Sequence, residues 1–175
     1  MPFHEEALIF IKHTETDDES LLPIEVVRKG YFVKTYKHGY KKVKYVLKEF
    51  VEPGITLMQK NNDIYHQFIV DEKQTILVEN MNSHIDASLK ESSPEKTLDD
   101  MVLLNAEFVE KLEKINDENV EKLITIVLEG DNDTYGIITP DLICETFSQS
   151  RLETMNIPEE LKNIEDEIDI TGLNI

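Results

Sequence analysis

Residues 28 to 48 carry eight lysine or arginine side chains and no carboxylate, interleaved with tyrosine and phenylalanine. Ammonium groups on one strand face can meet phosphates or carboxylates, and aromatic rings can stack on unpaired bases at about 1–3 kcal/mol each. This basic segment is therefore the main candidate for a binding surface. The residues that we expect to carry it are Lys34, Tyr36, Lys37, Tyr40, Lys41, Lys42, Lys44 and Lys48.

Three interpretations of the basic segment are open. Its lysines could contact nucleic acid, could dock onto an acidic surface such as the C-terminal half of this chain, or could protect an exposed edge strand from aggregation. The net charge of −18 opposes general binding to polyanions. A local positive face can still act, because charges are screened beyond about 8 Å at physiological salt. Nucleic acid is therefore the less favoured partner.

A group of carboxylates near the C-terminal third has a pattern typical of metal sites, although it is incomplete. Residues 131–142 resemble part of an EF-hand calcium loop, with Asp131 and Asp133 at loop positions 1 and 3 and Gly136 at the sharp-turn position 6. Leu142 stands at position 12, where a bidentate glutamate should complete the shell. The alternative is an acidic connecting loop with a glycine turn, and we expect no metal and no other cofactor.

Side chains of catalytic type are otherwise scattered. The five histidines include no pair at ligand spacing on a predicted helix, and Cys144 is predicted to pack on an apolar helix face. The chain has no glycine-rich phosphate loop and no Gly-x-Ser-x-Gly elbow. We therefore expect a protein that is not an enzyme and has no catalytic residues.

The segment 156–175 combines carboxylates with spaced aliphatic side chains. Leu161, Ile164 and Ile168 fall on one side of a possible short helix, which is typical of a helix that docks into a groove. The alternative is a fraying chain end. We expect the three aliphatic side chains to bind a partner.

The elements that must position these residues differ between the two halves of the chain. Residues 1–80 predict an antiparallel β-meander, a small barrel or sandwich, because β-branched and aromatic runs alternate with turns such as Lys37-His38-Gly39 and Pro53-Gly54. Within the strand predicted over 41–51, apolar and basic residues alternate, so one face should be buried and the other wet. Val43, Tyr45 and Leu47 form the first set and Lys42, Lys44 and Lys48 the second.

The second half predicts helices. Residues 81–97 are a polar linker, and residues 98–155 contain apolar side chains at helical spacing, with a further helix expected to begin after Thr139. An alternative for 123–128 is a strand paired with 135–139. The fold class that we predict is α+β, with the N-terminal β-meander followed by a helical acidic C-terminal segment. The apolar stripe consists of Met101, Leu104, Phe108, Leu112 and Ile115.

Composition and charge limit the function further. The chain has 175 residues, a single cysteine, no basic and apolar leader at its start, and no apolar run near the length of a membrane span. We expect a cytoplasmic protein without membrane contact. Residues 99–175 hold 20 acidic and five basic residues, so the charge is lopsided along the chain.

The sequence thus predicts a non-enzymatic protein–protein interaction or assembly protein with segregated basic and acidic surfaces. Charge complementarity between the surfaces could also drive homo-oligomer formation. Two alternatives remain open. One is a nucleic-acid-binding module that uses the basic, tyrosine-rich hairpin 28–48, and the other is an acidic mimic of nucleic acid that inhibits a basic partner.

Overall fold

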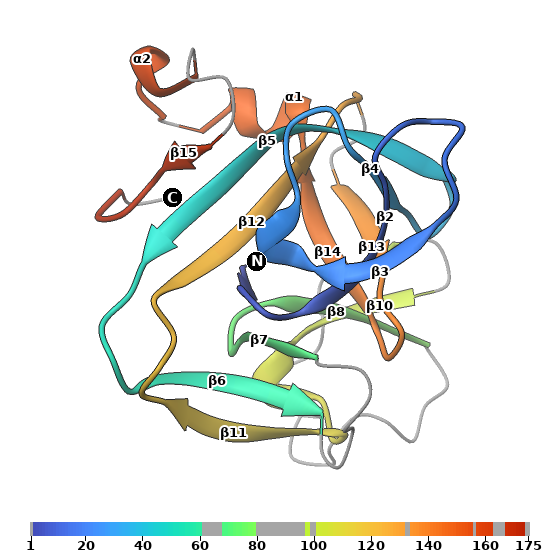
Figure 1. Ribbon diagram of the computed structural model, residues 1–175. Coiled ribbons are helices and arrows are strands. Elements are labelled where there is room, and N and C mark those ends of the chain that lie inside the picture. Colours follow the sequence, from blue (N-terminus) through green and yellow to red (C-terminus); the bar gives the residue numbers. More distant parts are fainter. Residues whose placement is uncertain are drawn as a thin grey trace.

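The computed structural model describes residues 2–60, 68–79, 97–98, 101–131, 134–155, 157–162 and 167–173. In these ranges the chain is almost entirely β-sheet, curled into a half-barrel (Figure 1). The predicted α+β class, with a helical acidic C-terminal segment, is therefore wrong. The elements in chain order are β1 (Phe3–His4), β2 (Leu8–Lys12), β3 (Ser20–Pro23), the 3-10 turn η1 (Ile24–Val26), β4 (Phe32–Lys34), β5 (Tyr40–Phe50), β6 (Ile55–Lys60), β7 (Ile69–Asp71), β8 (Thr75–Glu79), β9 (Thr97–Leu98), β10 (Met101–Asn105), the 3-10 turn η3 (Ala106–Phe108), β11 (Leu112–Asp117), β12 (Lys122–Leu128), β13 (Thr134–Ile138), β14 (Ile143–Ser148), α1 (Gln149–Glu153), α2 (Glu159–Lys162) and β15 (Ile168–Asp169).

Strand β12 is the centre of the sheet. It pairs antiparallel with β5 along one side, while its other side is shared between β1, which is antiparallel, and β14, which is parallel. Every residue from Leu123 to Leu128 is buried. Such a buried run, apolar except for Thr125, is typical of a strand that is covered on both faces.

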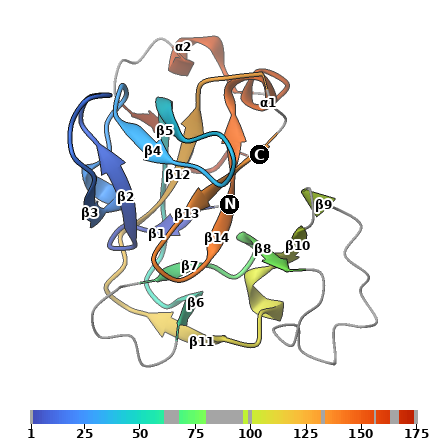
Figure 2. The same ribbon diagram turned by 90° about the vertical axis from the view of Figure 1, so that its right-hand side faces the viewer.

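The sheet bends until its two ends approach each other. β14 pairs with β13 on one side and with β8 on the other, and β5 leads through β4 to β2 and β3. A bridge between Thr35 and Ile137 connects the end of β4 with β13. The Tyr36 N–H donates to the Gly136 carbonyl at 2.9 Å. Figure 2 shows β4, β5, β12, β14 and β13 following one another around the curl.

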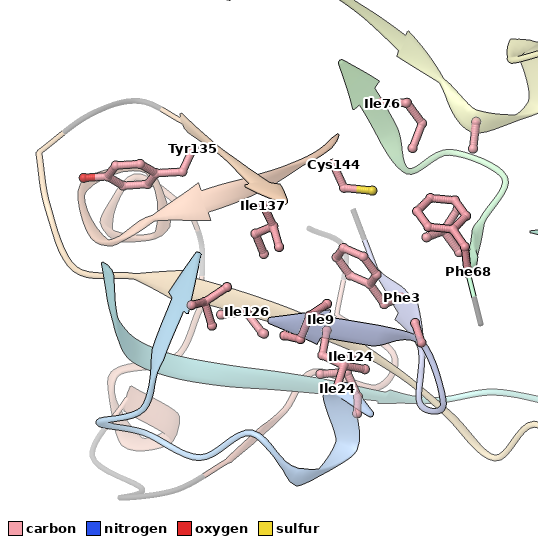
Figure 3. Close-up of a cluster of buried hydrophobic side chains, with 14 of the residues drawn as sticks. Phe3, Ile9, Ile24, Phe68, Ile76, Ile124, Ile126, Tyr135, Ile137 and Cys144 are labelled. Carbon is pink, nitrogen blue, oxygen red and sulfur yellow. The ribbon is translucent and has the colours of Figure 1, made fainter. Parts of the chain in front are cut away.

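The inside of the curl holds the largest cluster of buried side chains (Figure 3). Phe3, Ile9, Ile24, Ile126 and Ile137 are fully buried in it. A second cluster lies on the other side of β5 and β12 and includes residues of α1 and of the C-terminal segment. Both faces of the central strands are thus covered.

The helices expected in 98–155 are strands for a physical reason. Val102, Leu103 and Leu104 are consecutive and all buried, so β10 is covered on both sides and its apolar residues match a helical stripe only by coincidence. The helix expected after Thr139 is β14 instead. Among the described residues 140–155, α1 is the one helix, and its N-cap Ser148 accepts the Arg151 N–H at 3.2 Å.

The alternative interpretation of 123–128 as a strand is confirmed, but its expected pairing is wrong. The strand pairs with β5, β1 and β14, whereas β13 pairs with β14. In the N-terminal half, the predicted turns at Gly39 and Gly54 are confirmed, both glycines having positive φ. The expected linker 81–97 lies outside the described residues except for Thr97, and strands from both sides of it share one sheet.

Candidate interaction surface

Strands β2, β4 and β5 present alternate lysine and aromatic side chains on their solvent side. Lys12 lies opposite Phe32, and Phe32 lies opposite Lys42, which makes one row across the three strands. Residues at odd positions of β2, such as Ile9 and Ile11, point the other way and are fully buried. The alternation follows from the period of two along a strand with one face in the core.

A second row lies two residues further along each strand. Lys34 is opposite Tyr40, and the Lys34 ammonium lies 5.1 Å from the centre of the Phe10 ring. The Lys12 ammonium lies 4.4 Å from the Tyr40 ring, on the diagonal between the rows. Lysine and aromatic positions therefore alternate in both directions, as on a checkerboard. We call this surface the lysine–aromatic face, and it consists of Phe10, Lys12, Phe32, Lys34, Tyr40 and Lys42.

A carboxylate of the same chain already sits on this face. The Tyr40 hydroxyl donates to the carboxylate of Glu19, and the Lys34 ammonium lies 3.5 Å from a Glu19 oxygen. Glu19 ends the acidic loop that precedes β3, and its side chain is 35% exposed. The face therefore offers a positive charge and a hydroxyl donor that together hold a carboxylate in contact with water.

The other residues expected in the basic segment lie elsewhere. Lys41 is opposite the buried Val33, and its ammonium lies 6.0 Å from the Tyr135 ring. Lys44 lies over the Tyr45 ring, 5.8 Å from its centre. The Lys37 ammonium lies 5.3 Å from the ring of its neighbour Tyr36. Lys41 leaves the lysine–aromatic face because neighbouring residues of a strand point to opposite sides, and Lys37 because it lies in the turn between β4 and β5. Lys44 lies where one residue is inserted into β5.

The inserted residue is a β-bulge. Tyr45 is opposite Val127, but Val43 is opposite Leu128, so two steps along β5 correspond to one step along β12. Val43 consequently packs in the largest cluster, while Leu47 packs in the second cluster with Tyr45 against it. The predicted common face of Val43, Tyr45 and Leu47 is thus wrong, because a bulge exchanges the two sides of a strand.

Lys48 is withdrawn from solvent at the opposite end of β5. Its side chain is 11% exposed, and its ammonium pairs with the Glu167 carboxylate, which also lies 3.6 Å from the Arg28 guanidinium. A single carboxylate of the C-terminal segment thus lies beside two positive charges of the basic segment. The eight basic residues of the segment do not form one continuous surface.

The spaced aliphatic residues of the C-terminal segment are only partly described. Ile168 belongs to β15, which runs parallel to β5, and is fully buried against Leu47 and its neighbours in the second cluster. Leu161 lies in α2, but its side chain is outside the described residues. Ile164 is outside the described residues entirely. The structure therefore gives Ile168 an intramolecular contact on the chain's own sheet.

Part of the segment that resembled a calcium loop is strand β13. Gly136 lies inside β13, not in a turn, and Asp133 is outside the described residues. Within the described ranges, no group of three or more histidine, cysteine, aspartate or glutamate side chains could hold a metal ion. The Cys144 thiol is fully buried, and burial raises its pKa, so it stays protonated at neutral pH.

One histidine–aspartate pair was not visible in the sequence because 113 positions separate its members. His4 Nε2 lies 3.0 Å from an Asp117 oxygen, and His4 Nδ1 accepts the Glu6 N–H at 3.0 Å. Burial acts to raise the pKa of Asp117, but the N–H of Asn119 and the hydrogen bond from His4 outweigh it and lower the pKa. With both ring nitrogens engaged, His4 holds the chain in place and has no nitrogen left for a substrate.

No family model matches this chain, and no curated protein matches it. In the described part of the chain, no helix has the length and apolar character that crossing a membrane requires.

Proposed function

We propose that the protein acts by non-catalytic binding to a partner protein, and that the lysine–aromatic face binds an acidic segment of this partner. The observation that carries the proposal is the carboxylate of Glu19, which the Tyr40 hydroxyl and the Lys34 ammonium hold on this face. A surface that accepts a carboxylate of its own chain has the chemistry to accept one from another. Aromatic and basic side chains are also enriched where proteins bind each other.

The state of the rings supports an acidic protein over nucleic acid. Stacking on a base requires an open ring face. The Lys12 ammonium lies over the Tyr40 ring and the Lys34 ammonium over the Phe10 ring, at 4.4 and 5.1 Å from the ring centres. In addition, a molecule of net charge −18 repels a polyphosphate chain more strongly than a short run of carboxylates. A single-stranded nucleic acid is therefore the second candidate, and the test below separates the two.

The test measures binding of a fluorescent acidic peptide by anisotropy, at about 50 mM and about 300 mM salt. The variant Lys12→Glu with Lys42→Glu should weaken binding at least about tenfold at low salt, because two ammonium groups of one row become carboxylates. The control Lys111→Glu with Lys114→Glu makes the same change of charge at exposed positions of and beside β11, at the other end of the molecule. Control and wild type should bind alike.

A labelled single-stranded oligonucleotide is the parallel probe. If it binds and the peptide does not, the ligand is nucleic acid and the proposal is wrong. Equal loss in both double variants also contradicts it, because net charge and not this face would then decide binding. Sedimentation without peptide measures self-association and so shows whether a second copy of the chain supplies the acidic segment. If it does, the variant Lys12→Glu with Lys42→Glu loses self-association and the control keeps it.

A further inference from the structure

We infer that Glu19 occupies the position of an acidic side chain of the partner, and that an extended segment with acidic residues at alternate positions displaces it. This inference rests on the proposed function and adds the spacing of the ligand and a means of regulation. The acidic loop that ends at Glu19 would compete with the partner for the same ammonium and hydroxyl groups.

Glu19 is held in a way that allows exchange. Its carboxylate contacts only the Lys34 ammonium and the Tyr40 hydroxyl among the contacts described, and both side chains of the ion pair are more than a third exposed, at 38% and 35%. Ion pairs of this exposure contribute little to stability. The loop is anchored beside the face, because Leu21 of β3 pairs with Phe10 of β2. Glu19 thus stays close to the face whether or not its carboxylate is bound.

The spacing of the two rows sets the spacing of the ligand. Glu19 serves the row of Lys34, and within the described residues no carboxylate forms an ion pair with Lys12 or Lys42 in the other row. The rows are two residues apart along the strands, which corresponds to about 6.8 Å. Side chains on one side of an extended peptide repeat at the same distance. A ligand with acidic residues at positions i and i+2 therefore reaches both rows at once, which Glu19 alone does not do.

The experiment compares Glu19→Gln with Glu15→Gln in the full chain. Both variants remove one negative charge from the same exposed loop, but only Glu19 contacts the face. The ligands are two peptides of equal composition, one with glutamates at alternate positions and one with its glutamates adjacent. Glu19→Gln should bind the alternating peptide about two- to fivefold more tightly than wild type, the factor that release of an exposed ion pair provides. Glu15→Gln should change the affinity for the alternating peptide less than Glu19→Gln does. Wild type should bind the alternating peptide more tightly than the peptide with adjacent glutamates.

The outcomes separate this inference from the proposed function. If Lys12→Glu with Lys42→Glu abolishes binding but Glu19→Gln and Glu15→Gln bind equally, Glu19 is no competitor and the proposed function stands. If wild type binds the two peptides equally, the spacing is wrong. If none of the lysine or glutamate variants changes binding, or no peptide binds, the proposed function fails and this inference fails with it.

Discussion

Replacement of Gly136 by alanine should destabilise the protein, although this glycine has an ordinary strand conformation. A Cβ at this position would lie 2.8 Å from Ile143 Cγ2, 3.1 Å from Tyr36 Cβ and 3.3 Å from Leu77 Cδ2. The first of these distances is shorter than real Cβ contacts, and the other two are tighter than most. The Tyr36 atom is attached directly to the backbone that bridges to β13. The alanine therefore forces the two ends of the curled sheet apart.

The expected loss is about 1–2 kcal/mol in the free energy of unfolding. Extra carbon atoms in a packed core cost about 1–3 kcal/mol, and alanine returns about 0.4–1 kcal/mol by restricting the unfolded chain. For a chain of this length, a loss of that size lowers the melting temperature by about 2–8 °C. Urea denaturation followed by circular dichroism measures the free energy directly, and calorimetry measures the melting temperature.

A second substitution tests the cause. Leucine at position 143 lacks the γ2 methyl group that causes the shortest contact, so Gly136→Ala should cost less in the background of Ile143→Leu than in wild type. The relief should be partial because the contact with Tyr36 remains. If Gly136→Ala is as stable as wild type and the cycle shows no coupling, the close approach of β13 to the end of β4 is wrong.

Three further predictions concern buried contacts. Ile168→Ala should lower the free energy of unfolding by about 2–4 kcal/mol in urea denaturation, because its side chain is fully buried; an unchanged midpoint would show that β15 does not dock on the sheet. Arg151→Ala should cost about 3 kcal/mol, and Arg151→Lys clearly less, because Glu145 is 5% exposed and its carboxylate lies 2.7 Å from the guanidinium; equal stability of both variants would contradict this. The folded state lowers the pKa of Asp117, so its carboxylate stabilises the protein at neutral pH and this contribution is lost as the pH falls below the ordinary value of 3.8. Asp117→Asn should therefore be less stable than wild type at pH 7, with a difference that shrinks at acid pH, and a difference independent of pH in chemical denaturation would refute the assignment.

Local patterns were sufficient at the turns of Gly39 and Gly54, where both glycines have the positive φ that such turns need. They failed where a strand is covered on both sides, as in β10, because a buried strand and a buried helix both present unbroken apolar residues. The error in the second half of the chain follows from this ambiguity.

The candidate surface was predictable only in part. Lys34, Tyr40 and Lys42 were expected in a binding surface, and they share one face. Phe10 and Lys12 were missed, because they come from a strand on the far side of the acidic loop and only tertiary pairing brings them beside β4. The compensation of charges by residues far along the chain is invisible in a charge map for the same reason.

The central position of β12 has a consequence for how the protein acquires its structure. Strands β1 and β5 both form backbone hydrogen bonds with residues 122–128. Residues separated by about half of the chain or more must therefore come together before the sheet can form. Non-local pairing of this kind slows folding. During synthesis the first hundred residues leave the ribosome before β12, the strand on which they assemble. Until β12 follows, β5 lacks its main neighbour. Chaperone dependence and aggregation of truncated chains that stop before β12 are the expected cost of this chain order.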